Sequence, residues 1–135
     1  MNTQNYQFMF SLSFNHVAIS VKNVDISIAF YKKIFRLEEI ENTASTSKTR
    51  WLSLGNGHQL HLIPRPHLDV KTHKAVHFAL STSNIKEWLE HLQTLAIPYE
   101  DWLGTANKNY VRNDGIQQFY IQDPDGYWVE INNDV

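Results

Sequence analysis

The fold of this chain is decided by residues 15–21, NHVAISV, in which apolar and small or polar residues alternate. Strict alternation is typical of a β-strand that buries one face. The pattern returns as VHFALS at residues 76–81, where a shift of 61 residues places His16 on His77 and Ala18 on Ala79. The chain therefore contains an internal repeat, and this repeat determines the architecture.

A second match lies at the end of each half, where the shift is 69 and His61 falls on Glu130. The rise from 61 to 69 means that the second half carries 8 extra loop residues. Each half reads as strand–helix–strand–strand–strand, which predicts an α+β fold of two tandem βαβββ modules. We expect an N-terminal arm at 1–12 and a single domain at 13–135, with module 1 at about 13–64, a linker at 65–74 and module 2 at about 75–133.

The pattern also predicts the individual elements. We expect strands at 15–21, 51–54, 59–63, 76–81, 117–122 and 127–132, a short strand at 38–41 and an extended segment at 97–100. Helices are expected at 26–35 and 84–95, and a loop at 101–109. The first helix is expected to bury one apolar face, made of Ile26, Ala29, Phe30, Ile34 and Phe35. An Asn-Gly turn at 56–57 and an Asp-Pro-Asp-Gly turn at 123–126 are expected to close two hairpins.

Composition excludes several classes of protein. The chain has 135 residues, a formal net charge of -2 and 12 scattered Lys and Arg residues, which argues against a nucleic-acid partner. It has no cysteine, which excludes disulfides, thiol catalysis and iron–sulfur clusters. No apolar run approaches the ~20 residues of a membrane span, and the first residues lack the basic segment of a secretory signal. We therefore expect a cytoplasmic protein with no membrane partner.

Four side chains that can bind a metal share one face of the two predicted sheets: His16, His61, His77 and Glu130. Three imidazoles and one carboxylate, with no thiolate, suit one divalent Zn, Ni, Co, Mn or Fe ion. A single strand histidine is more often a hydrogen-bonded core or surface group, but four such side chains at repeat-related positions favour a metal site. His61 is the weakest candidate ligand and could instead be a base or a substrate contact.

Candidate substrate contacts follow from the same alternation. Trp51, Gln118 and Tyr120 share the face of the metal candidates, and Tyr120 could donate a hydrogen bond to a bound oxyanion. Arg112 lies on a loop that could cover a substrate and bind a carboxylate or phosphate. The alternatives are that Trp51 belongs to the core and that the loop of Arg112 is simply solvated. No residue is assigned to an organic cofactor.

Five segments together resemble the vicinal oxygen chelate superfamily, which includes glyoxalase I, bleomycin- and fosfomycin-resistance proteins and extradiol dioxygenases. These segments are 15–18, 28–35, 59–62, 76–79 and 119–130, so the likeness spans about residues 13–132. The resemblance implies that paired βαβββ modules form a metal cup whose ligands match His16, His77 and Glu130. At a fourth family position, often Glu in glyoxalase I, this chain has His61. The resemblance also implies a homodimer that shares ligands between subunits.

These observations predict a divalent-metal-dependent enzyme of glyoxalase type, a lyase or isomerase acting on a small oxygenated molecule. Its metal would stabilise an enediolate-like anion, with Glu130 or His61 as the base. The first alternative is a ring-cleaving dioxygenase, in which His16, His77 and Glu130 hold non-haem iron and His61 is the acid–base residue. The second is a non-catalytic protein of the bleomycin-resistance kind that binds a drug or metabolite.

Overall fold

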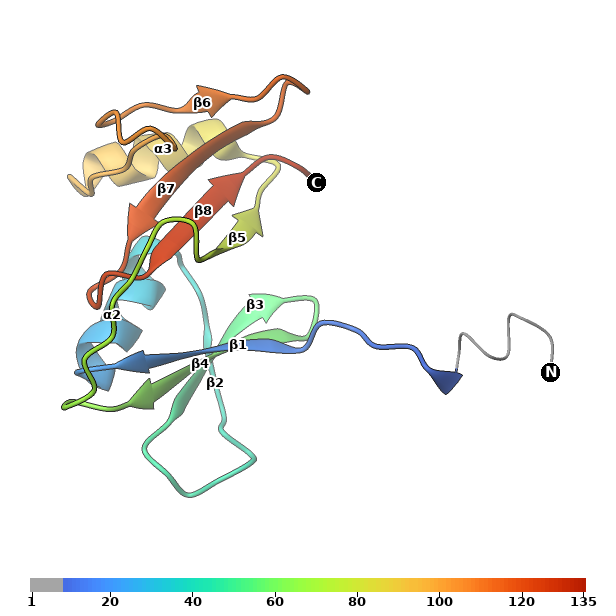
Figure 1. The fold of residues 1–135 in the computed structure, drawn as a ribbon, viewed down its shortest axis with the longest axis vertical. Coiled ribbons are helices and arrows are strands. Elements are labelled where there is room, and N and C mark those ends of the chain that lie inside the picture. The colour runs from blue at the N-terminus through green and yellow to red at the C-terminus, as the bar shows by residue number, and fades with distance from the viewer. Residues whose placement is uncertain (1–8) are drawn as a thin grey trace.

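The computed structural model describes residues 9–135 and contains two βαβββ modules (Figure 1). Residues 1–8 of the expected arm lie outside the described part. Module 1 consists of β1 (His16–Val21), α2 (Val24–Ile34), β2 (Glu39–Ile40), β3 (Arg50–Gly55) and β4 (His58–Pro64). Module 2 consists of β5 (His77–Ser81), α3 (Ile85–Thr94), β6 (Tyr110–Val111), β7 (Gln117–Gln122) and β8 (Trp128–Asn132). The α+β fold with two repeated modules is confirmed.

The two sheets have the same topology, with strand orders β1-β4-β3-β2 and β5-β8-β7-β6. In each sheet the first strand pairs in parallel with the last, and the last pairs antiparallel with the one before it. One face of each sheet packs into the core, where Leu52, Leu60, Phe119 and Val129 are fully buried. The other face carries the candidate site residues, as the alternation predicts.

Helix α2 begins at Val24, because the side chain of Asn23 accepts hydrogen bonds from the backbone N–H groups of Asp25 and Ile26. The apolar face expected for this helix is partly wrong, since Ile26 is 57% exposed and Ala29 is also exposed. The buried residues are instead Ser27, Ile28, Tyr31 and Ile34. The reason lies in tertiary contacts, because the hydroxyl groups of Ser27 and Tyr31 form hydrogen bonds with module 2. The apolar pattern of the helix sequence does not reveal such contacts.

The Asp-Pro-Asp-Gly turn between β7 and β8 fastens module 2 onto module 1. The Tyr31 hydroxyl donates to Asp123 Oδ2 over 2.7 Å, in a buried contact. Asp125 accepts from the Lys22 backbone N–H at 2.9 Å and from the Ser27 hydroxyl at 3.2 Å. We call these contacts the clasp. Burial raises the pKa of Asp123, although hydrogen bonds from Tyr31 and from backbone N–H groups oppose that rise.

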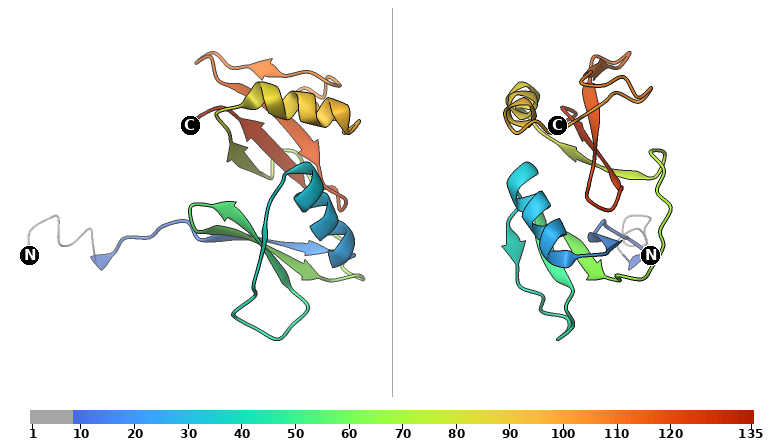
Figure 2. Two further views of the ribbon diagram at one scale, coloured as in Figure 1. Left: turned by 180° about the vertical axis from the view of Figure 1, so that it is seen from behind. Right: turned by 90° about the vertical axis from the view of Figure 1, so that its left-hand side faces the viewer.

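The helices also meet at the module interface, where His91 Nε2 lies 3.0 Å from the carbonyl oxygen of Ile34 (Figure 2). Together with the clasp, this contact fixes how the sheets are turned relative to each other. Neither of the two described helices is long and apolar enough to cross a membrane.

Module 2 departs from module 1 at its edge strand. The repeat equivalent of β2 is reduced to a single bridge between Glu100 and Tyr120, and the edge strand β6 forms ten residues later at Tyr110–Val111. The sequence pattern indicated a loop there, because its two-residue strand is too short to show alternation. The extra residues of the second half thus lie beside the face that carries Glu130.

Candidate metal centre

In module 1, neighbouring strands bring His16, His61 and Trp51 into one stack of rings. Strand β4 lies between β1 and β3, and Trp51 is directly opposite His61 in the ladder. The His16 and His61 ring centroids are 4.1 Å apart with planes 15° from parallel. Those of Trp51 and His61 are 4.1 Å apart with planes 3° from parallel. We call this group the module 1 ring stack, in which His61 is the middle ring.

The ring stack disfavours the charged form of His61. Burial lowers the pKa of His61, and electrostatic interaction with the neighbouring His16 lowers it further. Its Nε2 lies 2.8 Å from Gln59 Oε1, and His16 Nδ1 lies 2.7 Å from Asn15 Oδ1. An amide oxygen only accepts hydrogen bonds, so the imidazole nitrogen that faces it carries the proton. In a neutral ring the other nitrogen then has a free lone pair. Each imidazole can therefore present one nitrogen to a metal or a proton.

In module 2, Glu130 is held at both carboxylate oxygens. It is 7% exposed, accepts from the Tyr120 hydroxyl on Oε1 at 2.8 Å, and accepts from Asn132 Nδ2 on Oε2 at 2.7 Å. Burial raises the pKa of Tyr120, and its hydrogen bond to Glu130 raises it further, so the hydroxyl remains a donor. His77 Nε2 lies 3.5 Å from Glu130 Oε1. We call His77 and Glu130 the module 2 pair.

His77 is oriented by the backbone just before its strand. Its Nδ1 lies 2.7 Å from the carbonyl oxygen of Lys74. A carbonyl only accepts, so Nδ1 carries the proton and Nε2, on the Glu130 side, carries the lone pair in the neutral ring. Metal-binding histidines are commonly oriented by such a bond on the second nitrogen.

One chain does not bring the two halves together. His16 lies beside His61, and His77 lies beside Glu130, on separate sheets. Among residues 9–135, no three His, Asp or Glu side chains are grouped so that they could hold a metal ion. The structure of a single chain thus contains two incomplete donor sets.

The expected substrate contacts lie beside these donors. Trp51 is part of the ring stack, Tyr120 binds Glu130, and Gln118 Nε2 lies 3.5 Å from the Tyr120 hydroxyl. Arg112 pairs with Asp114, and its positive charge acts to lower the pKa of Tyr120. Arg112 directly follows β6, the edge strand of the module 2 sheet.

Sequence reasoning missed two residues at this face, Lys74 and Trp102. The Lys74 ammonium pairs with Glu100 and lies 4.6 Å from the centre of the Trp128 ring. The Trp102 ring centroid is 6.2 Å from that of His77 and 5.6 Å from that of Tyr120. Both residues belong to segments interpreted as a linker and a loop. The signal in the sequence was Trp102, a large aromatic residue in the loop at 101–109.

Comparison with known protein families agrees with this architecture. The sequence model of the Glyoxalase/Bleomycin resistance protein/Dioxygenase superfamily matches residues 13–131. The chain belongs to this superfamily. The resemblance found in the sequence motifs is thereby confirmed, and most members of the superfamily are enzymes.

Individual relatives within the superfamily are distant. "Glyoxylase I 4" of Arabidopsis thaliana is 28% identical over 130 residues, which cover 90% of this chain and 70% of that protein. "Metallothiol transferase FosB" of Shouchella clausii (strain KSM-K16) is 26% identical over 118 residues, covering 87% of this chain and 77% of the relative. The crystal structure of lactoylglutathione lyase from Agrobacterium tumefaciens has a TM-score of 0.70 at 21% identity, covering 92% of this chain and 95% of that one. This last likeness shows the shared fold.

Superfamily members typically use a divalent metal, and the donors of this chain fit one. Neutral imidazoles and a carboxylate are ligands for borderline divalent ions. In the module 2 pair, the imidazole lone pair and the carboxylate already face the same space 3.5 Å apart. The two stacked rings differ, because rings 15° from parallel and 4.1 Å apart do not direct their nitrogen lone pairs at one point.

Proposed function

We propose that this protein is a divalent-metal-dependent enzyme of glyoxalase type, a lyase or isomerase acting on a small oxygenated molecule. Its site would be completed by two copies of the chain, so that module 1 of one copy faces module 2 of the other. The observation that carries this proposal is the division of the donors into two incomplete sets on separate sheets. A homodimer supplies each set with the half that it lacks.

The ligands in this proposal are His16, His77 and Glu130, with His61 as the fourth ligand or the base. The stacking of His61 on His16 favours the role of base, because parallel rings do not direct their lone pairs at one ion. A base must be unprotonated near neutral pH, and the lowered pKa of His61 meets this requirement. Glu130 is the alternative base.

The remaining residues hold the reacting groups in place. Tyr120 and Asn132 fix both oxygens of Glu130, so the carboxylate cannot rotate away from the substrate. Trp51 and Trp102 offer flat apolar walls in the two halves, and Arg112, directly after the edge strand β6, would serve an anionic group. A bound divalent metal would stabilise negative charge on a substrate oxygen. Proton removal from the adjacent carbon would then fall to His61 or Glu130.

A ring-cleaving dioxygenase is the second candidate. If His61 is the base, the ligand set becomes two histidines and one carboxylate, the set that binds non-haem iron in many oxygenases. The two candidates differ in the metal and in oxygen use. Iron in the purified protein, with oxygen uptake on adding a catechol, would favour the dioxygenase. Another divalent metal, with turnover of a 2-oxoaldehyde and thiol mixture, would favour the lyase or isomerase.

The test is complementation between two variant chains, each of which is expected to bind no metal by itself. His16→Ala and Glu130→Ala are each expected to lose bound metal when expressed alone. When the two chains carry different tags and are purified as a heterodimer, one site has both wild-type halves and the other has neither. Elemental analysis should then find about half the metal content of the wild-type dimer.

Two results would contradict the proposal. A heterodimer that binds no metal would mean that the donors do not combine across two chains. If the wild-type protein takes up none of Zn, Ni, Co, Mn and Fe, the metalloenzyme hypothesis is wrong. The hypothesis of a non-catalytic ligand-binding protein then remains. Thermal unfolding of each variant provides the control that the alanine chains are folded.

A further inference from the structure

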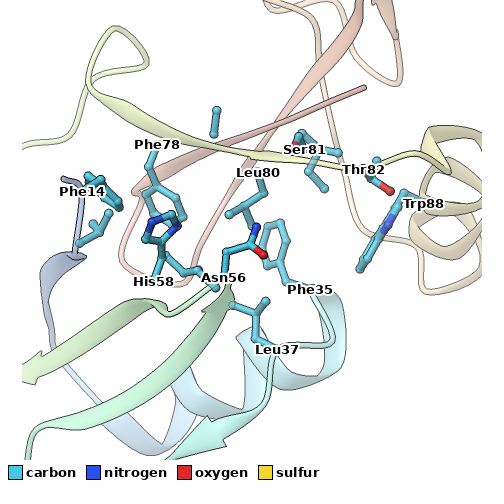
Figure 3. A pocket seen from close by; sticks show the side chains of 14 residues that line it. Phe14, Phe35, Leu37, Asn56, His58, Phe78, Leu80, Ser81, Thr82 and Trp88 are labelled. Carbon is cyan, nitrogen blue, oxygen red and sulfur yellow. The ribbon is translucent and has the colours of Figure 1, made fainter. Parts of the chain in front are cut away.

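An apolar cleft of about 580 Å³ lies between the two modules (Figure 3). Its walls come from both modules and include Leu37 and Leu54 on one side and Phe78, Leu80 and Trp88 on the other. None of the 14 residues that line it is Asp, Glu, Lys or Arg. Cavities of this size hold drug-sized ligands in other proteins, so the cleft has room for several apolar side chains.

The N-terminal arm, which we define as Met9–Phe14, has the matching character. In Figures 1 and 2 it runs away from both sheets. Met9 is 63% exposed, Leu12 99% and Phe14 60%. Residues 1–15 contain no Asp, Glu, Lys, Arg or His, although segments that stay in water are usually rich in charge. An uncharged arm with exposed large apolar side chains is suited to being covered.

The arm is directed out of its own molecule. Its last residue, Phe14, already lines the cleft and touches the His58 ring edge-on, with centroids 5.3 Å apart. The next residue is fixed, because the Gln59 backbone N–H donates to the Asn15 carbonyl. From this fixed point at the cleft rim the chain leads outward, so Met9 and Leu12 do not line the cleft of their own chain and stay free to enter that of a second copy.

We infer that the arm of one copy lies in the inter-module cleft of a second copy, and that the exchange is reciprocal. The inference rests on the second copy that the proposed function requires. The arm ends at Phe14, two residues before His16 at the start of β1. Binding of the arm to the second copy would therefore fix the position of His16 relative to module 2 of that copy. The arm thereby acts as a positioning element for the shared site, besides holding the two copies together.

Self-association provides the first measurement. Leu12 is 99% exposed in the single chain, so Leu12→Asp leaves the fold of that chain unaffected. Burying a leucine favours association enough that Leu12→Asp should weaken the dimer by about tenfold or more, measured by sedimentation at matched concentrations. Ile26→Asp is the matched control, because Ile26 is an exposed apolar residue on α2, where an acidic side chain in the first turn is favourable.

Cross-linking then locates the arm. The chain has no cysteine, so only introduced thiols can react. A Leu12→Cys chain is mixed with a Ser81→Cys chain that carries a large tag, and the mixture is treated with a short bismaleimide. Ser81 is chosen because it lines the cleft and is close to cysteine in size. A product that contains one chain of each kind is expected. In the double variant at high dilution, a link within one chain would place the arm in its own cleft and overturn the inference, as would the absence of any link.

The failure of this inference differs from failure of the proposed function. If Leu12→Asp dimerises and binds metal like the wild type, the arm inference is wrong and the metal site stands. If the mixed cross-link forms but the wild type takes up none of the five metals, the arm inference stands and the proposed function is wrong. If both are correct, Leu12→Asp loses metal and dimer together.

Discussion

Where module 1 carries the His61 imidazole, module 2 carries the Glu130 carboxylate, and the two are held by different forces. His61 is held by ring stacking between His16 and Trp51. Glu130 is held by directional hydrogen bonds on both oxygens, from Tyr120 and Asn132. At the position of Trp51 the second module has Tyr120, so a change from an apolar ring to a phenol accompanies the change from imidazole to carboxylate.

This difference shows how one repeated scaffold produces two chemical halves. Stacking buries an imidazole and so disfavours its charge, while hydrogen-bond donors support a carboxylate without neutralising it. Within residues 9–135, neither half alone groups the three donors that a metal site needs. Residues at equivalent positions of the two modules are therefore expected to differ in their importance for metal binding and stability.

Replacing the carboxylate of the module 2 pair should have the largest effect. Glu130→Gln keeps the size of the side chain but removes the charge of the proposed ligand, and we expect metal affinity to fall by about 100-fold or more. Competition with a chromophoric chelator measures this. Glu41→Gln, which alters an exposed carboxylate in module 1, is the control. Equal affinities for the two variants would mean that Glu130 is not a ligand.

Breaking the clasp should come next. Tyr31→Phe leaves Asp123 Oδ2 without its buried donor, and the free energy of unfolding should fall by about 1–3 kcal/mol. Urea unfolding at matched protein concentration gives the value. Tyr110→Phe, at a tyrosine 40% exposed, should change it by less than about 0.5 kcal/mol. A Tyr31→Phe variant as stable as this control would show that the clasp does not hold the modules.

Removing the donor to Glu130 should have a moderate effect. Tyr120→Phe leaves Asn132 as the remaining donor, so metal affinity should fall by about tenfold. Trp51→Phe, at the equivalent position of module 1, keeps an aromatic ring beside His61 and should change the affinity less. A larger loss in Trp51→Phe would reverse the ranking of the two halves.

The buried Asp123 predicts a pH dependence of stability. Its folded-state pKa is raised, so its contribution is fully present below the ordinary value of ~3.9 and is lost as pH rises through the folded pKa. Asp123→Asn mimics the protonated acid. The stability of the wild type relative to this variant should therefore decrease from about pH 4 upward and then level off, as measured by unfolding at each pH. A difference that grows in favour of the wild type would contradict the raised pKa.

The smallest effect concerns the ring stack. Trp51→Ala uncovers His61 in the metal-free protein, and the pKa of His61 should rise toward its ordinary value because burial is the main cause of its lowering. His16→Asn removes only the lesser cause, the charge, and should raise the pKa less. Titration of the imidazole protons by NMR compares the two variants. A greater rise in His16→Asn would make charge the dominant cause.

Much of the fold was predictable, because both the internal repeat and the alternation of apolar and polar residues in the strands can be recognised directly in the sequence. The shifts of 61 and 69 residues predicted both modules, and side-chain parity predicted that His61 shares a face with His16 and Trp51. Parity assigns a side chain to a face of its own sheet only. It contains no information on how two sheets are turned, which here depends on the clasp.

The errors have the same origin. The buried face of α2 is centred on Tyr31 rather than on Ile26 and Ala29, because Tyr31 meets an aspartate 92 residues away. The place of Lys74 at the site could not be predicted, because its partners Glu100 and Trp128 lie in distant segments of the sequence. Long-range polar contacts of this kind depend on the assembled fold, and no local pattern marks them.

The clasp also has a consequence for the timing of folding during synthesis. Tyr31 is made 92 residues before Asp123, and at 5–20 residues per second the ribosome needs roughly 5–20 s to supply the partner. During that interval the emerging first module exposes the α2 surface that later contacts the turn. A pause in the translation of the second half would prolong this exposure.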